Sequence, residues 1–219
     1  MKNKQESPDV SVVVCTYNHG KWIERCLRSL LNQDFVKRQE YEVIIIDDCS
    51  KDYTQKVLKN FKFKNFRFFK NNKNIGLPKS LNKAIKLSLG KYVVRVDSDD
   101  FVRRNFIYLT RLFLNLNREY QAVSVDYFKV NNNEEFISKN SAKKEEIACG
   151  VMFRKECLYD IGLYNPDFKM REGHEMKIRF QKKHKIGHLN LPLYKYRVHD
   201  TNRTKNLKVL KKYDRKLKT

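Results

Sequence analysis

Over its first hundred residues the chain alternates short, nearly continuous apolar segments with segments whose apolar side chains recur at helical spacing. Continuous apolar segments of this length are typical of strands that are buried on both faces of a sheet. Because strands that alternate with helices require crossover connections, the pattern predicts an α/β fold with a parallel sheet between two layers of helices. The predicted strands span residues 10–16, 41–47, 65–70 and 91–97, and the predicted helices span residues 21–32, 54–60 and 78–89.

The second half of the chain departs from this alternation, as expected for a segment that builds a binding wall. We predict a single domain over residues 1–219, with a regular half at about 8–102, an irregular half at about 103–200 and a basic tail at 201–219. The last predicted strand contains Pro192 and is therefore expected to lie near a sheet edge. The predicted helices span residues 104–116, 154–161 and 175–183, and the predicted strands span residues 122–130 and 186–199.

The apolar runs, the first residues and the cysteines of the chain favour a cytoplasmic protein without a membrane span or a secretory signal. The longest apolar runs have only a few residues, whereas a membrane span needs about 20. The first nine residues are polar and carry no apolar segment, so we expect no secretory signal. The five cysteines are odd in number and lack CxxC spacing, which favours reduced thiols and a cytoplasmic protein.

The net charge of +22 is concentrated in two segments, residues 56–73 and residues 200–219. In the second segment Leu207, Leu210, Tyr213 and Leu217 recur at helical spacing among basic residues. Such a helix either packs on the domain or contacts an anionic membrane surface, and both readings stay open here. Nothing in the sequence resembles a nucleic-acid-binding module, so we expect no nucleic-acid partner.

Polar residues follow each predicted strand of the first half. Ligands of open parallel sheets bind beyond the carboxyl ends of the strands, so these residues are expected to share one site. At least four of them are acids, and a divalent cation is the simplest reason to gather carboxylates at one edge. The strand ends read Thr16-Tyr17-Asn18, Asp47-Asp48, Asn74-Ile75-Gly76 and Asp97-Ser98-Asp99-Asp100.

Four sequence blocks, SVVVCTYNHGKWIERCLRSLLNQ, VIIIDDCSKD, NIGLPKSLNKAI and GKYVVRVDSDD, resemble the family 2 glycosyltransferases of the GT-A fold in order and spacing. They cover residues 10–102, and weaker likeness continues to about residue 203. The resemblance implies a Rossmann-like, mostly parallel central sheet. It also implies inverting transfer of a sugar from a nucleotide-diphospho-sugar, with a UDP-sugar as the expected donor, to a hydroxyl of a glycan or lipid-linked acceptor in surface-polysaccharide synthesis.

The resemblance also implies roles for single residues, with Mn²⁺ or Mg²⁺ as cofactor. Asp99 matches the metal ligand, and His199 matches a histidine that approaches the diphosphate or the metal. Arg95 either pairs with a neighbouring acid or reaches a phosphate. The positions that match the nucleotide-sugar site are Thr16, Tyr17, Asn18, Asp47, Asp48, Asn74, Gly76, Arg95, Asp97 and Ser98.

The expected catalytic base raises a question that the sequence leaves open. The family usually places a Glu-Asp pair before an apolar helix, and here the Asp position is Gly173. Glu172 and Glu175 are the two candidates, with a slight preference for Glu175, which we expect just before the helix. The missing Asp also keeps open an alternative: a non-catalytic nucleotide-sugar-binding relative that acts as an assembly module. The enzyme itself would be cytoplasmic, or peripheral at the inner membrane face.

Overall fold

The structure is a computed structural model that describes residues 7–217, so the outermost predicted boundaries, at residues 1–6 and 218–219, lie outside the described residues. The strands are β1 (Val10–Thr16), β2 (Tyr41–Asp47), β3 (Phe66–Lys70), β4 (Tyr92–Arg95), β5 (Phe101–Val102), β6 (Ala122–Val130), β7 (Phe136–Asn140), β8 (Met152–Arg154) and β9 (Ile186–Arg197). The α-helices are α1 (Gly20–Leu31), α2 (Thr54–Leu58), α3 (Leu77–Leu87), α4 (Phe106–Leu116), α5 (Lys155–Asp160), α6 (Glu172–Gln181) and α7 (Leu207–Lys216).

The strands of the described chain form one sheet in the order β3-β2-β1-β4-β8-β6-β9-β5, with β7 added to β6. The four strands of the first half are parallel, as the βα alternation predicts. The second half adds β8 antiparallel to both β4 and β6, and β9 runs parallel to β6. The predicted α/β fold with a mostly parallel central sheet is therefore confirmed.

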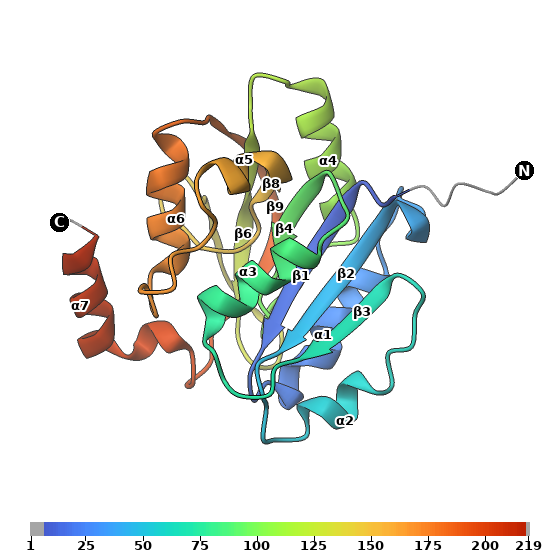
Figure 1. The fold of residues 1–219 in the computed structure, drawn as a ribbon, viewed down its shortest axis with the longest axis vertical. Helices are drawn as coiled ribbons and strands as arrows, with labels where there is room; N and C mark the ends of the chain where they lie inside the picture. The colour runs from blue at the N-terminus through green and yellow to red at the C-terminus, as the bar shows by residue number, and fades with distance from the viewer. Residues whose placement is uncertain (1–6, 218–219) are drawn as a thin grey trace, which may run out of the picture.

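Helices cover both faces of this sheet, and each face has its own apolar core (Figure 1). Val12 and Val14 of β1 join Leu27 of α1 in one core, whereas Val13 joins Leu81 of α3 in the other. Alternate side chains of a strand point to opposite faces, which is why a continuous apolar run suits this position. Each such side chain, once fully buried, contributes roughly 1.5–3 kcal/mol to folding.

One prediction about the second half is confirmed and one was wrong. Strand β9 lies next to the edge of the sheet, as Pro192 predicts, because it pairs with β6 along its length and with the two-residue β5 only at Tyr194 and Lys195. Its register against β6 shifts around Asp126, which lies opposite Pro192, and this irregularity accommodates a residue that has no backbone N–H. Helix α6 begins at Glu172 rather than at residue 175, because Arg171 before it adopts a left-handed backbone with a φ of 62°.

The C-terminal helix α7 packs on the domain. Tyr213 is 9% exposed and forms a small apolar cluster with Phe168 and Met170, and Asp214 pairs with Arg171 at 2.6 Å. The packed-helix reading of the basic tail is thus the one that the structure adopts, while contact with a membrane surface stays a prediction. None of the helices within residues 7–217 is long and apolar enough to cross a membrane.

Candidate active site

The loops that follow β1, β2, β3 and β4 meet at the carboxyl edge of the sheet. The backbone N–H of Asp48 donates to the carbonyl of Thr16 at 2.8 Å, and that of Gly76 donates to the carboxylate of Asp48 at 2.8 Å. His19 Nδ1 and Ser98 Oγ form a hydrogen bond of 2.7 Å. Parallel strands place their ends at one edge, so residues far apart in the sequence come to line one site.

Asp48 holds the loop between β3 and α3. Its carboxylate accepts hydrogen bonds from Asn71 Nδ2 at 2.8 Å and from the backbone N–H groups of Ile75 at 2.9 Å and Gly76 at 2.8 Å. Gly76 has a φ of 87°, in the region that a side chain disfavours, and begins α3. Asn74, which the sequence assigns to the nucleotide, is exposed in the same loop. Asp48 therefore fixes the position of that loop.

Asp47 acts in the same way on the loop after β2. It is 2% exposed and accepts hydrogen bonds from the N–H of Ser50 and from Gln55 Nε2, both at 2.9 Å. The neighbouring Thr16 hydroxyl is buried and has no hydrogen-bond partner among the described residues. A buried hydroxyl without a partner is costly, so this oxygen is suited to a ligand at the sheet edge.

Asn18 joins the loops after β1 and β2. Its backbone is left-handed, with a φ of 56°, and its N–H donates to Ser50 Oγ at 2.9 Å. Its side-chain oxygen accepts from the N–H of Lys51 at 2.8 Å. Tyr17, between Thr16 and Asn18, is left 41% exposed beside these loops. Asn18 is therefore a loop-ordering residue in this structure, while the ring of Tyr17 stays open to solvent beside it.

A buried ion network connects β4 to α6. Arg95 is 5% exposed and binds Asp97 with two hydrogen bonds, of 2.6 and 3.1 Å, and Glu172 with one of 3.0 Å. Burial alone would lower the pKa of an arginine, but the carboxylates of Asp97 and Glu172 raise the pKa of Arg95 well above its usual value. Of the two readings for Arg95, the structure forms the ion pair.

Asp99 forms a pair with His199, whose side chain is almost fully buried. Asp99 and His199 Nε2 lie 3.0 Å apart, while His199 Nδ1 contacts the hydroxyl of Thr201 at 2.9 Å. The imidazole also stacks on Trp22, with ring centroids 4.2 Å apart. Burial opposes ionisation of Asp99, yet the hydrogen bond to His199 and the charge of His19 keep the pKa of Asp99 below its usual value.

Two groups of residues could hold a metal ion. One ligand atom each from Asp97, Asp100 and Cys149 lie within 4.8 Å of one another. Both oxygens of Asp100 already accept hydrogen bonds of 2.8 Å, one from the Tyr194 hydroxyl and one from the backbone N–H of Arg197. A thiol is also a poor ligand for Mg²⁺ or Mn²⁺. Asp99 and His199 fit better, because they present an ionised carboxylate beside an imidazole nitrogen.

The two candidate bases both lie in the first turn of α6, and both are held by arginines. Glu175 accepts two hydrogen bonds from Arg179, at 2.5 and 2.8 Å, and Arg179 also donates to the carbonyls of Ile161 and Leu163. Glu172 accepts one hydrogen bond from Arg95, which connects it to the acids of the sheet edge. The preference for Glu175 stays a prediction, while these contacts place Glu172 nearer to the other site residues.

Gly173 lies against Ala148. A Cβ atom at position 173 would be 2.4 Å from the Cβ and 3.0 Å from the Cα of Ala148, closer than any real contact. The position at which the family usually has an aspartate is therefore filled by a close backbone contact in this chain. Any side chain there would have to displace α6 or the segment that contains Ala148.

Sequence reasoning missed several residues that shape this edge. Tyr194 donates its hydroxyl hydrogen to Asp100 at 2.8 Å, and its oxygen lies 3.1 Å from the backbone N–H of Asp97. Trp22 supports His199 through ring contact. Trp22 is the one tryptophan of the chain and stands just after the first strand-end loop, and this position is the sequence feature that could have pointed to it. No sequence feature pointed to Tyr194, because its role depends on a pairing between β9 and β5.

Comparison with known proteins shows the family to which this sequence belongs. The sequence profile described as glycosyl transferase family 2 matches residues 11–185, well over half of the chain. The chain belongs to glycosyl transferase family 2. The fold expected from the resemblance is the one observed, and the order of strand-end loops is that of the family.

Relatives of this family-2 chain include poly(ribitol-phosphate) beta-N-acetylglucosaminyltransferase TarS of Staphylococcus aureus, 42% identical over 96 residues. That match covers 43% of this chain and 17% of TarS, so the matched segment spans less than a fifth of that relative's length. A TarS structure in complex with UDP-GlcNAc has a TM-score of 0.78 at 24% identity and covers 90% of this chain and 61% of that one. A mannosyltransferase from Pyrobaculum calidifontis with GDP-Man and Mn²⁺ has a TM-score of 0.71 at 18% identity, covering 90% and 59%.

The close contact at Gly173 predicts an unusual response to mutation. Gly→Ala within a helix ordinarily stabilises it by up to about 1 kcal/mol, but Gly173→Ala should lower the free energy of unfolding by about 1–3 kcal/mol through overpacking. The double variant Ala148→Gly/Gly173→Ala should recover most of that loss. Urea unfolding of the parent, both single variants and the double variant measures this. Equal stability of Gly173→Ala and the parent would contradict the contact.

Proposed function

We propose that this chain is the catalytic part of a metal-dependent, inverting glycosyltransferase. It would move a sugar from a nucleotide-diphospho-sugar, a UDP-sugar, to a hydroxyl of a glycan or lipid-linked acceptor in surface-polysaccharide synthesis. The observation that carries the proposal is the meeting of four strand-end loops at the carboxyl edge of the sheet, where the loop after β4 carries Asp99, the partner of His199. The relatives that act on poly(ribitol-phosphate) support the acceptor class.

The donor end of the site follows from groups on the loops. The exposed ring of Tyr17 offers a surface on which a nucleotide base can stack. The buried Thr16 hydroxyl, which lacks a partner within the described chain, can bond to the ribose or phosphate. Asp47 and Asp48 contribute mainly by holding the loops in place, since their oxygens accept hydrogen bonds from those loops.

Asp99 and His199 would hold the divalent cation, Mn²⁺ or Mg²⁺. A cation in that place would neutralise the charge that develops on the leaving diphosphate. The contact between His199 Nδ1 and Thr201 orients the imidazole so that Nε2 faces Asp99. Asp97, bound on both oxygens by Arg95, is better suited to accept a hydrogen bond from the ribose than to bind the ion.

For the base we now favour Glu172 over Glu175. Both oxygens of Glu175 are bound by Arg179, which also anchors Glu175 to the carbonyls near the end of α5. Glu172 gives only Oε1 to Arg95, so Oε2 is the oxygen better placed to take a proton from an acceptor hydroxyl. The proton would move from the attacking hydroxyl to this carboxylate as the bond to the sugar forms.

A second candidate function is a non-catalytic nucleotide-sugar-binding relative. The observation that favours it is the packing of Gly173 on Ala148, which leaves no room for the usual aspartate. Such a protein would bind UDP-sugars and release no nucleotide. A cytoplasmic location, with contact to the inner membrane face through exposed lysines of α7, is part of the first proposal only.

Replacement of Asp99 tests the metal assignment. Asp99→Asn should weaken UDP binding at least about tenfold in the presence of Mn²⁺, because one charged ligand is lost, and should leave binding without Mn²⁺ little changed. Sugar transfer from a UDP-sugar panel should fall in parallel. Asp200→Asn, at a fully exposed carboxylate beside His199, is the matched control. An Asp99→Asn protein that keeps the Mn²⁺ dependence of the parent would contradict the assignment.

Glutamine variants of the two acids separate the candidate bases. Loss of a general base typically costs about 10²–10⁴-fold in rate. We therefore expect Glu172→Gln to lower kcat by that factor, with donor affinity little changed. Glu175→Gln should lose stability and keep most of its kcat. The reverse pattern would restore Glu175 as the base, and no effect of either variant on kcat would remove α6 from the chemistry.

A further inference from the structure

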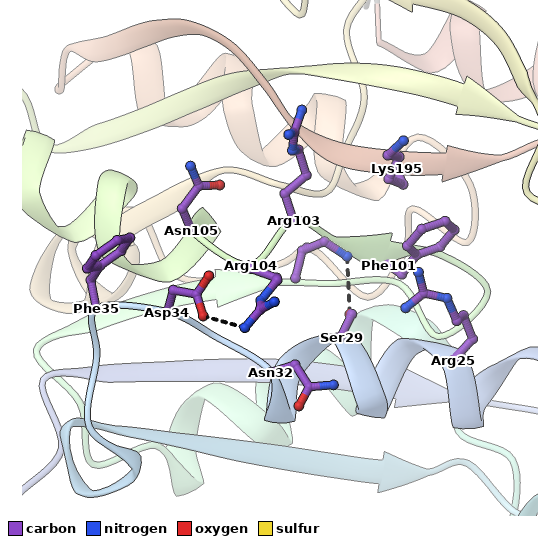
Figure 2. A pocket seen from close by; sticks show the side chains of 11 residues that line it. Arg25, Ser29, Asn32, Asp34, Phe35, Phe101, Arg103, Arg104, Asn105 and Lys195 are labelled. Atoms are coloured by element: carbon purple, nitrogen blue, oxygen red, sulfur yellow. Dashed lines mark hydrogen bonds and ion pairs between the residues drawn. The ribbon is translucent and has the colours of Figure 1, made fainter.

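A cavity of about 700 Å³ lies between α1 and the segment that joins β5 to α4 (Figure 2). This volume is in the range of sites that bind small molecules. None of the residues assigned to the nucleotide, the metal or the base lines the cavity. It is therefore separate from the candidate active site, although β5 begins directly after Asp100.

Four cations line this cavity, and two of them are left without a counter-ion. Arg104 pairs with Asp34 at 2.9 Å, and Arg25 pairs with a glutamate at the end of the β6–β7 turn. Arg103 and Lys195 form no ion pair with any residue in the described part of the chain. Figure 2 shows these two side chains near one another on the side of the cavity away from α1.

The ammonium group of Lys195 lies over the ring of Phe128, 4.6 Å from its centroid, and other cations surround it. Its partial burial, with added repulsion from the guanidinium groups of Arg103 and Arg25, lowers the pKa of Lys195. Cations that crowd one cavity repel each other, and an anionic ligand removes that repulsion. Guanidinium and ammonium groups together are suited to bind the oxygens of a phosphate or a carboxylate.

An aromatic ring stands at the rim of the same cavity. Phe35 is 76% exposed, and its backbone is left-handed with a φ of 60°, a conformation that costs energy for a residue with a side chain. Its ring contacts that of Tyr108, with centroids 5.4 Å apart. Asn32, from the end of α1, adds an exposed amide to the lining. An exposed ring beside polar amides and cations is suited to the apolar face of a sugar ring.

A chain of contacts leads from this cavity to the metal pair. Arg25 binds Glu134 at 2.9 Å, and Glu134 binds Arg197 at 3.1 Å. Arg197 in turn donates from Nε to the backbone carbonyl of Asp99 at 2.9 Å. The cavity and the candidate active site are thus connected by a continuous series of side-chain and backbone contacts.

We propose that this cavity binds an anionic segment of a glycan chain, with a phosphate or carboxylate between Arg103 and Lys195 and a sugar ring against Phe35. The shared chemistry is an anion carried on a sugar chain. The proposal deepens the proposed function in one respect: it identifies the bound glycan as the acceptor, held at a distance from its reacting end. Only that identification rests on the proposed function. Binding itself needs neither donor nor metal.

The test is a binding measurement by calorimetry on the whole chain without nucleotide sugar. The probes are a phosphodiester-linked tetramer of N-acetylglucosamine, a hyaluronan tetrasaccharide, neutral chitotetraose and inorganic phosphate. Arg103→Gln/Lys195→Gln should weaken binding of the charged probe at least about tenfold, as expected for a lost charge-assisted hydrogen bond. Phe35→Ala should weaken it by a smaller factor. Lys62→Gln/Lys64→Gln, at two exposed lysines before β3, carries the same change of charge and should bind like the parent.

Each outcome decides the proposal. Tighter binding of either charged tetramer than of chitotetraose supports it, and the tighter of the two identifies the anion as phosphate or carboxylate. The proposal is overturned if chitotetraose binds as tightly as the charged tetramers, or if inorganic phosphate binds as tightly as the phosphodiester-linked tetramer. It is also overturned if Arg103→Gln/Lys195→Gln binds the charged probe like the parent. Because no transfer is measured, failure here is distinct from failure of the proposed glycosyltransferase activity, which UDP release measures. Unchanged thermal unfolding of the variants shows that they are folded.

Discussion

The buried guanidinium of Arg95 is the charge on which the arrangement of the acids depends. Taking a charged group out of water costs several kcal/mol, and this cost is offset only when the geometry of its partners is good. Asp97 supplies two hydrogen bonds and Glu172 one, so Arg95 ties the end of β4 to the start of α6. In the proposed function this ion network would hold the nucleotide side and the acceptor side of the site in a fixed relation.

The remaining acids of the sheet edge divide into two kinds. Asp47 accepts hydrogen bonds from the loop after β2 and from α2, Asp48 accepts them from the loop between β3 and α3, and Asp100 is bound by the Tyr194 hydroxyl and a backbone N–H. Asp99 differs, because its partner is an imidazole, which can exchange a hydrogen bond for a metal ion. The basic cavity behind β5 is a separate feature, built from cations that the acids of the edge do not neutralise.

Several strands and the loops of the candidate site could be predicted from the sequence, and the structure shows why. Strands β1, β2 and β6 occupy the predicted bounds, because a strand buried on both faces has an unambiguous apolar pattern. The strand-end rule also found the loops of the site. It could not find the start of α6, which depends on a left-handed Arg171, or the contact of Gly173 with Ala148, which joins segments 25 residues apart. Nor could it tell a loop-holding acid from one that is open to a ligand, since that depends on partners distant in sequence.

Hydrogen–deuterium exchange with and without UDP and Mn²⁺ tests most directly the central claim, that the donor nucleotide binds at the carboxyl edge of the sheet. The account predicts slower exchange in the loops after β1, β2, β3 and β4 and around His199. It predicts no change in the segment that lines the basic cavity at the end of α1. Protection confined to that cavity, or no protection at the four loops under saturating UDP and Mn²⁺, would contradict the account.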